Sequence, residues 1–466
     1  MGTRVGTSED DIERLLGKLT PRARALLLNG ATTWRTRGEP AVGLRELVMS
    51  DGPAGVRGQS WDERSTAVLL PSATALAATW DETLVERLGG LLAAEARRKG
   101  VHVLLAPNLN LHRSPLGGRH FECFSEDPEL TGRIGAALVR GIQAGGVAAT
   151  AKHYVANDSE TDRLTVDVRV GERALREVYL APFEAAVAAG VRLVMAGYNA
   201  VDGTTMTAGG LLADPLKSDW GFDGVVVSDW GAVRDTVHTA CAALDLAMPG
   251  PDGPWGEALA RAVADGSVPE AAVDDKVRRL LRLAARCGAL GDERLPVRAP
   301  SRTRDVQALA RRAVAAGAVL LSNRGVLPLD PGRLGTVAVI GEHAARTRTQ
   351  GGGSAGVFPH HEVSVLDGVR AALRGRARVV HVPGPRPDGP RPRWTPRCAP
   401  TRAPVCPECC CASWTPTAPN CTPNGAAAGV CWSRVWCRAR TPSRSAPCCV
   451  PAPGAGGRSA SRASGG

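Results

Sequence analysis

Short apolar runs alternate with helical patterns along the first 290 residues, and this alternation constrains the fold more than any other feature. The runs end in Gly, Pro or polar residues, and the segments between them have helical spacing over roughly 10–20 residues. Such alternation is typical of βαβ units, so we expect residues 1–290 to form a (β/α)8 barrel of the α/β class. Strands are expected at about 48–50, 101–106, 147–151, 191–196, 224–227 and 244–248, and helices at about 82–99, 129–144, 171–189 and 208–219.

The stretch GFDGVVVSDW at 221–230 contains a candidate catalytic residue. Gly224–Val227 has the composition of a short buried strand, and Asp229 follows it directly. A carboxylate at the carboxyl end of a buried parallel strand lies at the barrel mouth, where barrel enzymes place their chemistry. The adjacent Trp230 offers a flat apolar face of the kind that sugar rings pack against. Alternatively, Asp229 caps the next helix, because Asp is a favoured N-cap residue.

Seven motifs together carry a family resemblance over about residues 44–383. In this order and on one domain, they resemble glycoside hydrolase family 3, the β-glucosidase type. The motifs are DGPAGVR at 51–57, LAATWD at 76–81, APNLNLHRSPLGGRHFECFSEDP at 106–128, KHYVANDSETDR at 152–163, VMAGYN at 194–199, GVVVSDW at 224–230 and LAMPG at 246–250.

The resemblance implies a β-glucosidase that hydrolyses terminal non-reducing β-D-glucosyl residues with retention, with Asp229 as the nucleophile. It implies no cofactor and no metal, and it makes Arg119 a structural residue paired with Glu122 or Glu126. The N-acetylhexosaminidase branch is disfavoured because KHYVANDSETDR lacks a second His. The implied sugar-binding residues are Asp51, Arg113, Lys152, His153, Arg163, Tyr198 and Trp230.

Several of these residues also have simpler structural interpretations. In these alternative interpretations, Asp51 in Asp-Gly-Pro would be an ordinary turn residue and Tyr198 would only pack against its neighbours. Neighbours on a strand point to opposite faces, so Lys152 and His153 both reach a sugar only if the backbone bends there. If the site forms, the cations implied by the resemblance are expected to keep Asp229 ionised. Those cations are Arg113, Lys152, His153 and Arg163.

A linker rich in Pro, Arg and Gly at about 288–302 precedes a second α/β segment. Residues 303–385 resemble the first half of the family's α/β sandwich, with strands expected at 318–321, 337–340 and 378–381. The loop Gln350–Ala355 resembles a family loop that reaches towards the sugar. It is equally well interpreted as a flexible glycine loop.

Residues 386–466 differ in composition from everything before them. They contain ten of the thirteen Cys and carry eleven Arg against Asp388 and Glu408, a formal charge of +9 within the total of +11. No apolar period is present, so we expect no packed fold. A shifted reading frame or a genuine low-complexity tail explains this segment, and the frame shift is favoured because the break falls within a domain.

Charge and hydropathy narrow the function further. The basic residues concentrate in the tail rather than on a folded face, so nucleic-acid binding is not indicated. No stretch reaches transmembrane length and the N-terminus lacks an apolar signal region, so no membrane partner and a cytoplasmic location are expected. The expected partner is a small β-glucoside, and the sequence leaves the oligomeric state open.

The sequence offers no clear candidate for the acid/base of the predicted enzyme. The resemblance places it in a Glu far downstream, yet the candidates after Gly341 are Glu342, Glu362 and Glu408, and none has the family's surrounding motif. We therefore expect little hydrolysis of natural glucosides, because a missing general acid typically costs about 10²–10⁴-fold. The alternative is a catalytically inert or sugar-binding remnant.

Overall fold

The computed structural model describes residues 8–292 and 303–384. The predicted tail, residues 386–466, lies outside the described residues. In the first range, the short 3₁₀ or π segments are η1 (Pro40–Val42), η2 (His120–Glu122), η3 (Leu175–Leu180) and η4 (Gly210–Leu212). The helices and strands are α1 (Glu9–Gly17), α2 (Pro21–Leu27), β1 (Met49–Asp51), α3 (Ala73–Ala77), α4 (Glu82–Arg98), β2 (Val103–Leu105), α5 (Pro128–Ala144), β3 (Ala148–Tyr154), β4 (Asp167–Val168), α6 (Glu172–Ala174), α7 (Ala181–Ala188), β5 (Leu193–Ala196), β6 (Ala200–Val201), β7 (Thr204–Thr205), β8 (Val225–Ser228), α8 (Val237–Cys241), α9 (Glu257–Ala264) and α10 (Glu270–Arg286).

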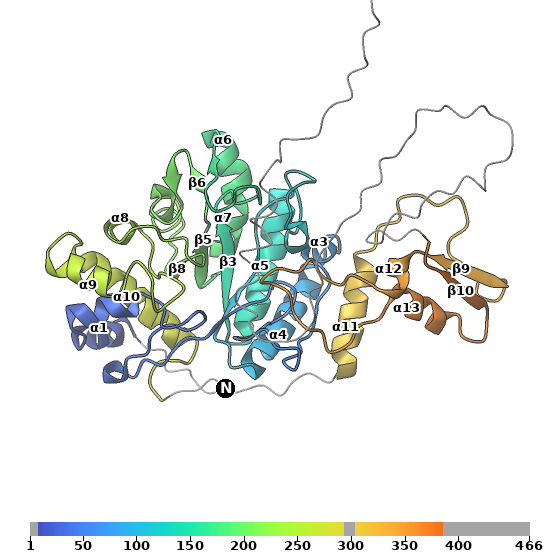
Figure 1. The fold of residues 1–466 in the computed structure, drawn as a ribbon, viewed down its shortest axis with the longest axis horizontal. Helices are drawn as coiled ribbons and strands as arrows, with labels where there is room; N and C mark the ends of the chain where they lie inside the picture. The colour runs from blue at the N-terminus through green and yellow to red at the C-terminus, as the bar shows by residue number, and fades with distance from the viewer. Residues whose placement is uncertain (1–7, 293–302, 385–466) are drawn as a thin grey trace, which may run out of the picture. The chain divides into compact units, whose positions relative to one another are not determined.

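A parallel sheet in the order β1-β2-β3-β5-β8 forms the centre of the first segment (Figure 1). Every residue of these strands is buried, as expected for a parallel sheet covered on both faces. Beyond β8 the ring continues through single bridges: Val227 with Leu246, Ala247 with Asn29, Gly30 with Thr36, and Arg35 with Val48 beside β1. The α/β class and the curled parallel sheet are confirmed. The sheet has five regular strands among the described residues, and irregular segments complete its curve.

Helices α4, α5 and α7 pack side by side against this sheet (Figure 1). Where α4 meets α5, a Cβ on Gly141 would lie 2.0 Å from the Glu86 carbonyl oxygen, so only glycine allows this approach. Asp81 begins α4 as an N-cap, accepting a hydrogen bond from the Leu84 N–H at 2.9 Å. The close helix packing fixes the strands whose ends carry the site.

Three predicted elements are absent as regular structure from the described residues. The strand expected at 244–248 is reduced to the single bridges at Leu246 and Ala247. Residues 208–219 form turns and the short η4 rather than a helix, because Pro215 interrupts the pattern and cannot donate a helical hydrogen bond. Residues 318–321 form no strand, and Leu321 is 92 % exposed. Residues 318–321 have strand-like composition but pair with no strand among the described residues.

The second described range contains α11 (Thr303–Ala316), β9 (Thr336–Ile340), α12 (Glu342–Ala345), α13 (Val365–Ala372) and β10 (Arg378–Val382). β9 and β10 pair in parallel over five residues. Side chains alternate between exposed and half-buried in β9, and the three central residues of β10 are half-buried, so neither strand is buried like those of the first sheet. Among helices in the described parts of the chain, none is long and apolar enough to cross a membrane.

Candidate active site

Polar side chains gather where neighbouring strands of the first sheet end. Asp51 is the last residue of β1, and Lys152 and His153 lie near the carboxyl end of β3. Tyr198 follows β5, and Asp229 follows β8. Because the strands are parallel, their carboxyl ends share one edge of the sheet. Four of these residues are nearly inaccessible, with Lys152 3 % and Asp229 8 % exposed. The structure therefore brings these five predicted site residues to one place.

A bulge in β3 allows both Lys152 and His153 to face the site. Lys152 pairs with Met195 of β5, whereas Tyr154 pairs with the very next residue, Ala196, so His153 is the extra residue. A β-bulge re-aims side chains that would otherwise alternate between faces. The backbone bend that the sequence argument required is present, and Lys152 is only 3 % exposed.

Asp229 has three polar neighbours. The Trp230 N–H donates to its Oδ1 at 2.8 Å, and His153 Nε2 lies 3.8 Å from its Oδ2. The Tyr198 hydroxyl is within hydrogen-bonding reach of this carboxylate and of the Trp230 carbonyl oxygen, the latter at 3.0 Å. Asp229 does not cap a helix, because the next one, α8, starts only at Val237. The carboxylate points into the strand-end cluster instead.

Burial raises the pKa of Asp229, and the opposing effects of Lys152, the Trp230 N–H, Arg119 and Tyr198 do not fully offset it. His153 contributes no positive charge to this balance. Burial, together with the charges of Arg119, Lys152 and Arg163, holds its pKa well below the usual range. The expectation that His153 acts as one of the cations is therefore wrong, since a buried imidazole surrounded by cations stays neutral.

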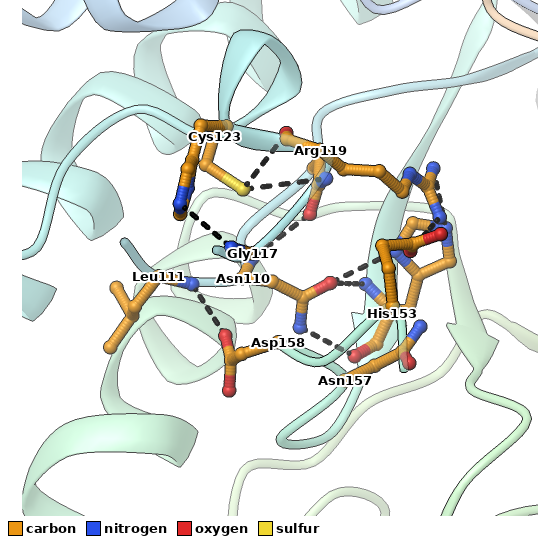
Figure 2. Close-up of a pocket in the computed structure, with 11 residues that line it drawn as sticks. Asn110, Leu111, Gly117, Arg119, Cys123, His153, Asn157 and Asp158 are labelled. Atoms are coloured by element: carbon orange, nitrogen blue, oxygen red, sulfur yellow. Dashed lines mark hydrogen bonds and ion pairs between the residues drawn. The ribbon is translucent and has the colours of Figure 1, made fainter. Parts of the chain in front are cut away.

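Asn110 fixes the orientation of the neutral His153 ring (Figure 2). Its Oδ1 accepts from the His153 backbone N–H at 3.0 Å and from Nδ1 at 2.9 Å, and its Nδ2 donates to the His153 carbonyl at 3.0 Å. Nδ1 therefore carries the proton, and Nε2 presents its lone pair to Arg119 at 3.3 Å. The sequence analysis missed Asn110, although it lies in the quoted 106–128 motif.

Asp51 has the opposite electrostatic balance to Asp229. Burial by itself would raise its pKa, but the charges of Lys152 and Arg57 outweigh burial and lower it. Lys152 Nζ lies 3.3 Å and an Arg57 terminal nitrogen 3.8 Å from the carboxylate. The lowered pKa makes Asp51 easier to ionise than an ordinary carboxyl, and Arg57 is a partner that the sequence analysis did not single out.

Arg113 is not brought into this cluster. It lies exposed with its guanidinium 5.6 Å from the centre of the Tyr179 ring. Arg119 occupies the inner position: it donates to both Glu122 oxygens at 3.0 and 2.9 Å and also reaches His153. The predicted pair with Glu122 is present, but Arg119 also faces the site. Two arginines six residues apart in one loop give no sequence signal for which one turns inward.

Arg163, Trp230 and a second tryptophan form the more open side. Arg163 lies 5.3 Å from the Tyr198 ring centre and is 41 % exposed in its side chain. Trp230 donates from Nε1 to the Thr33 carbonyl at 2.7 Å, and its ring centre lies 5.2 Å from that of Trp34. The paired indoles offer an apolar surface next to Asp229, and Trp34 was not foreseen.

The loop at 350–355 contacts the Asp51 region. Arg57 donates to the Ser354 carbonyl at 2.8 Å, and the Ser354 side chain hydrogen-bonds to Asp51. The glycine-rich loop therefore lies against a predicted sugar-binding residue, and its contact with the sugar itself stays a prediction. Of the acid candidates, Glu342 at the start of α12 lies 3.6 Å from Arg346, the residue that caps the end of this helix. Glu362 accepts a hydrogen bond from the Thr349 hydroxyl at 3.3 Å. Glu408 lies outside the described residues.

A small cavity lies behind His153 (Figure 2). Burial raises the pKa of Asp158 in its wall to about 6, although the Leu111 N–H and Arg113 act in the opposite direction. Within residues 8–292 and 303–384, no group of His, Cys, Asp or Glu is arranged to hold a metal ion. The cavity is lined by Asn108, Asn110, Leu111, Gly117, Arg119, His120, Cys123, His153, Asn157, Asp158 and Glu160.

Solved structures with a similar fold include two β-glucosidases in complex with glucose. A β-glucosidase from Kluyveromyces marxianus in complex with glucose matches with a TM-score of 0.75 and 35 % identity, over 81 % of this chain and 45 % of that one. Beta-glucosidase 3B from Thermotoga neapolitana in complex with glucose matches with a TM-score of 0.72 and 34 % identity, over 79 % of this chain and 55 % of that one.

Curated relatives and family models point the same way. The beta-glucosidase of Rhizobium radiobacter is 46 % identical over 80 % of this chain and 46 % of its own length. Beta-glucosidase B of Emericella nidulans is 44 % identical over 80 % of this chain and 45 % of its own. This chain therefore spans about half the length of these relatives. The model of the glycosyl hydrolase family 3 C-terminal domain matches residues 318–446, past the predicted boundary at 385, which stays a prediction. The model of the family's N-terminal domain matches residues 39–283, more than half of the chain, and the chain belongs to glycosyl hydrolase family 3.

Proposed function

We propose that this chain hydrolyses terminal non-reducing β-D-glucosyl residues with retention, and that Asp229 is the nucleophile. The observation that carries the proposal is the buried Asp229 carboxylate at a strand end, beside His153 and close enough to Lys152 to feel its charge. The names of the relatives and neighbours, all of them β-glucosidases, supply the sugar class.

In the first step, an Asp229 oxygen forms a bond to the anomeric carbon while the bond from that carbon to the aglycone oxygen breaks. The departing oxygen takes a proton from a general acid. In the second step, water attacks the same carbon, gives a proton to the corresponding base and releases Asp229. Only ionised Asp229 attacks, so its raised pKa confines the reaction to pH values above that pKa.

The sugar is held by groups of different character. Ionised Asp51 accepts from hydroxyls remote from the anomeric carbon, and Lys152 and the His153 ring line the same edge. Arg119 takes the donor role that the resemblance gave to Arg113, because its guanidinium contacts His153 and lies within the influence of Asp229. Arg163, Tyr198 and the indole face of Trp230 complete the proposed subsite.

The nucleophile can be tested separately from the acid. A 2,4-dinitrophenyl 2-deoxy-2-fluoro-β-glucoside has a leaving group that needs no protonation, and its fluorine slows the second step so that the glycosyl-enzyme accumulates. Incubation should add one fluoroglucosyl mass to the intact protein, and peptide mapping should place it on Asp229. Asp223→Asn is the matched control, because Asp223 lies in the same stretch but pairs with Arg286 at the surface.

The outcomes separate the two candidate functions. Labelling of wild type and Asp223→Asn, but not of Asp229→Asn, supports the proposal. A label on another residue contradicts the assignment of Asp229. Glucose binding without any label would favour the sugar-binding remnant. We also expect slow turnover of cellobiose, since neither Glu342 nor Glu362 is placed with the cluster by its contacts.

A further inference from the structure

The loop that carries Ser354 is tied to the first segment through residues 66–68. The Ala67 N–H donates to the Phe358 carbonyl at 2.8 Å, and the His360 N–H donates to the Ala67 carbonyl at 3.1 Å. His360 Nδ1 lies 2.6 Å from the Thr66 hydroxyl. These contacts form a short parallel bridge between segments almost three hundred residues apart. A loop anchored in this way is not free to move independently of the sheet.

Glu95 lies where the two loops meet. It belongs to α4, is only 7 % exposed, and is far from Asp229 in the sequence. Its Oε2 accepts from the Val68 N–H at 3.4 Å and lies 3.8 Å from His360 Nε2. Arg98 donates to both of its oxygens at 3.1 and 3.0 Å and to the Thr66 carbonyl at 3.0 Å. One buried carboxylate therefore contacts both loops.

The same two loops enclose Asp51. The first continues from Asp51 through Arg57, whose guanidinium donates to the Ser354 carbonyl. The second holds its own shape because the Gln350 side chain bonds to both the N–H and the carbonyl of Val357, at 2.8 and 2.6 Å. Val357 is buried against Gly55. The position of Ser354 relative to Asp51 thus depends on how firmly the loops are joined.

We propose that Glu95 is a positioning residue for the Asp51 part of the sugar site: it joins loop 66–68 to loop 350–360 so that Ser354 and Arg57 hold Asp51 in place. The proposal rests on the proposed function for its link to a sugar. Glu95 touches neither Asp51 nor Asp229 in the described contacts, so it acts through the loops. The basic side chains in contact with it are Arg98 from its own helix and His360 from the loop.

Loss of the Glu95 charge should weaken sugar binding and leave the rate of the chemical step nearly unchanged. Glu95→Gln keeps the shape and an oxygen for the Val68 N–H but removes the charge that attracts Arg98 and His360. We expect KM for dinitrophenyl β-D-glucoside to rise roughly tenfold, the scale of one charge-assisted hydrogen bond, with kcat nearly unchanged. For the 4-deoxy analogue, which lacks a hydroxyl remote from the anomeric carbon, the effect should shrink to about twofold or less.

Two further variants control for folding. Glu86→Gln removes a surface carboxylate of the same helix, one that pairs with Arg140 at 3.3 Å, and should change neither constant. His360→Ala cuts the same tie from the exposed side and should reproduce the effect of Glu95→Gln even if that variant folds poorly. Equal losses on both substrates would show a merely structural role and overturn the proposal.

Amide hydrogen exchange of the unliganded protein tests the tie without any activity. Glu95→Gln should speed exchange at Ala67 and His360, whose amides form the bridge, and leave β8 amides unchanged. If the wild type neither turns over nor becomes labelled, the proposed function fails, and the exchange result still decides the tie. Unchanged exchange at both amides would overturn the role of Glu95.

Discussion

Two strand ends of one sheet, at β1 and at β8, each hold a buried aspartate, yet the two carboxyls differ in charge balance. At β1, Lys152 and Arg57 outweigh burial and lower the pKa of Asp51. At β8, burial prevails and raises the pKa of Asp229, because its contacts are a backbone N–H, a phenol and a neutral His153. The difference teaches that close cations make a binding carboxylate, whereas a desolvated carboxylate with fewer cations remains available for attack.

The largest expected effect comes from removing each carboxylate in turn. Asp229→Asn should reduce fluoroglucoside labelling on the order of 10⁴-fold, as loss of a covalent nucleophile does. Asp51→Asn should mainly raise KM, by about 10–100-fold, because hydrogen bonds to an ionised group are lost. Steady-state and labelling kinetics measure both. A larger loss of kcat in Asp51→Asn than in Asp229→Asn would reverse the assignment.

Stability should respond in opposite directions at the two ends. A lowered pKa makes Asp51 stabilising above its unfolded pKa, and this stabilisation is lost as pH falls through the folded value. A raised pKa makes Asp229 favour the folded state only at low pH, and this contribution is lost as pH rises through the folded value. At pH 7, urea unfolding should therefore show Asp51→Asn less stable and Asp229→Asn more stable than wild type. The same sign for both variants would contradict the comparison.

Lys152→Met removes the ammonium that pairs directly with Asp51 at 3.3 Å and that also acts on Asp229 through its charge. It leaves Asp51 buried with one fewer partner, and breaking a buried pair typically costs about 3–5 kcal/mol. The difference in free energy of unfolding between Lys152→Met and wild type should diminish as the pH falls, because a protonated Asp51 carries no charge for the ammonium to balance. Lys217→Met, at a pair with Asp245 beside the amino end of β8, is a control for a buried lysine, and its effect on labelling should be smaller than that of Lys152→Met. Equal labelling by Lys152→Met and wild type would count against Lys152 in the site.

The smallest expected effect compares the two arginines of the 106–128 loop. Arg119→Lys loses the two-pronged contact with Glu122 and the contact with His153, and should lower kcat/KM about tenfold. Arg113→Lys should have almost no effect, because this side chain is exposed over Tyr179. Dinitrophenyl glucoside hydrolysis measures both. A larger effect of Arg113→Lys would restore the role that the resemblance gave it.

Much of the site was readable from the sequence because strand ends are marked locally. The run Gly224–Val227 followed by Asp229 indicated a strand end, and the structure has β8 at Val225–Ser228. Asp51, Lys152, His153 and Tyr198 also lie at or after expected strands, but it was the family resemblance that singled them out. The same local reasoning failed at 208–219, where Pro215 interrupts the helical pattern, and at 318–321, where a strand-like composition finds no pairing strand among the described residues.

The sequence by itself determined the α/β alternation, the family resemblance and the chemical type of most site residues, since each depends on neighbours within a few positions. Only the tertiary structure decided that Arg119 rather than Arg113 faces the site, that His153 is neutral, and that Ser354 meets Asp51. These properties depend on burial and on charges brought together from distant segments. A pKa or a turn direction is fixed by what surrounds a side chain in space, which local sequence patterns do not encode.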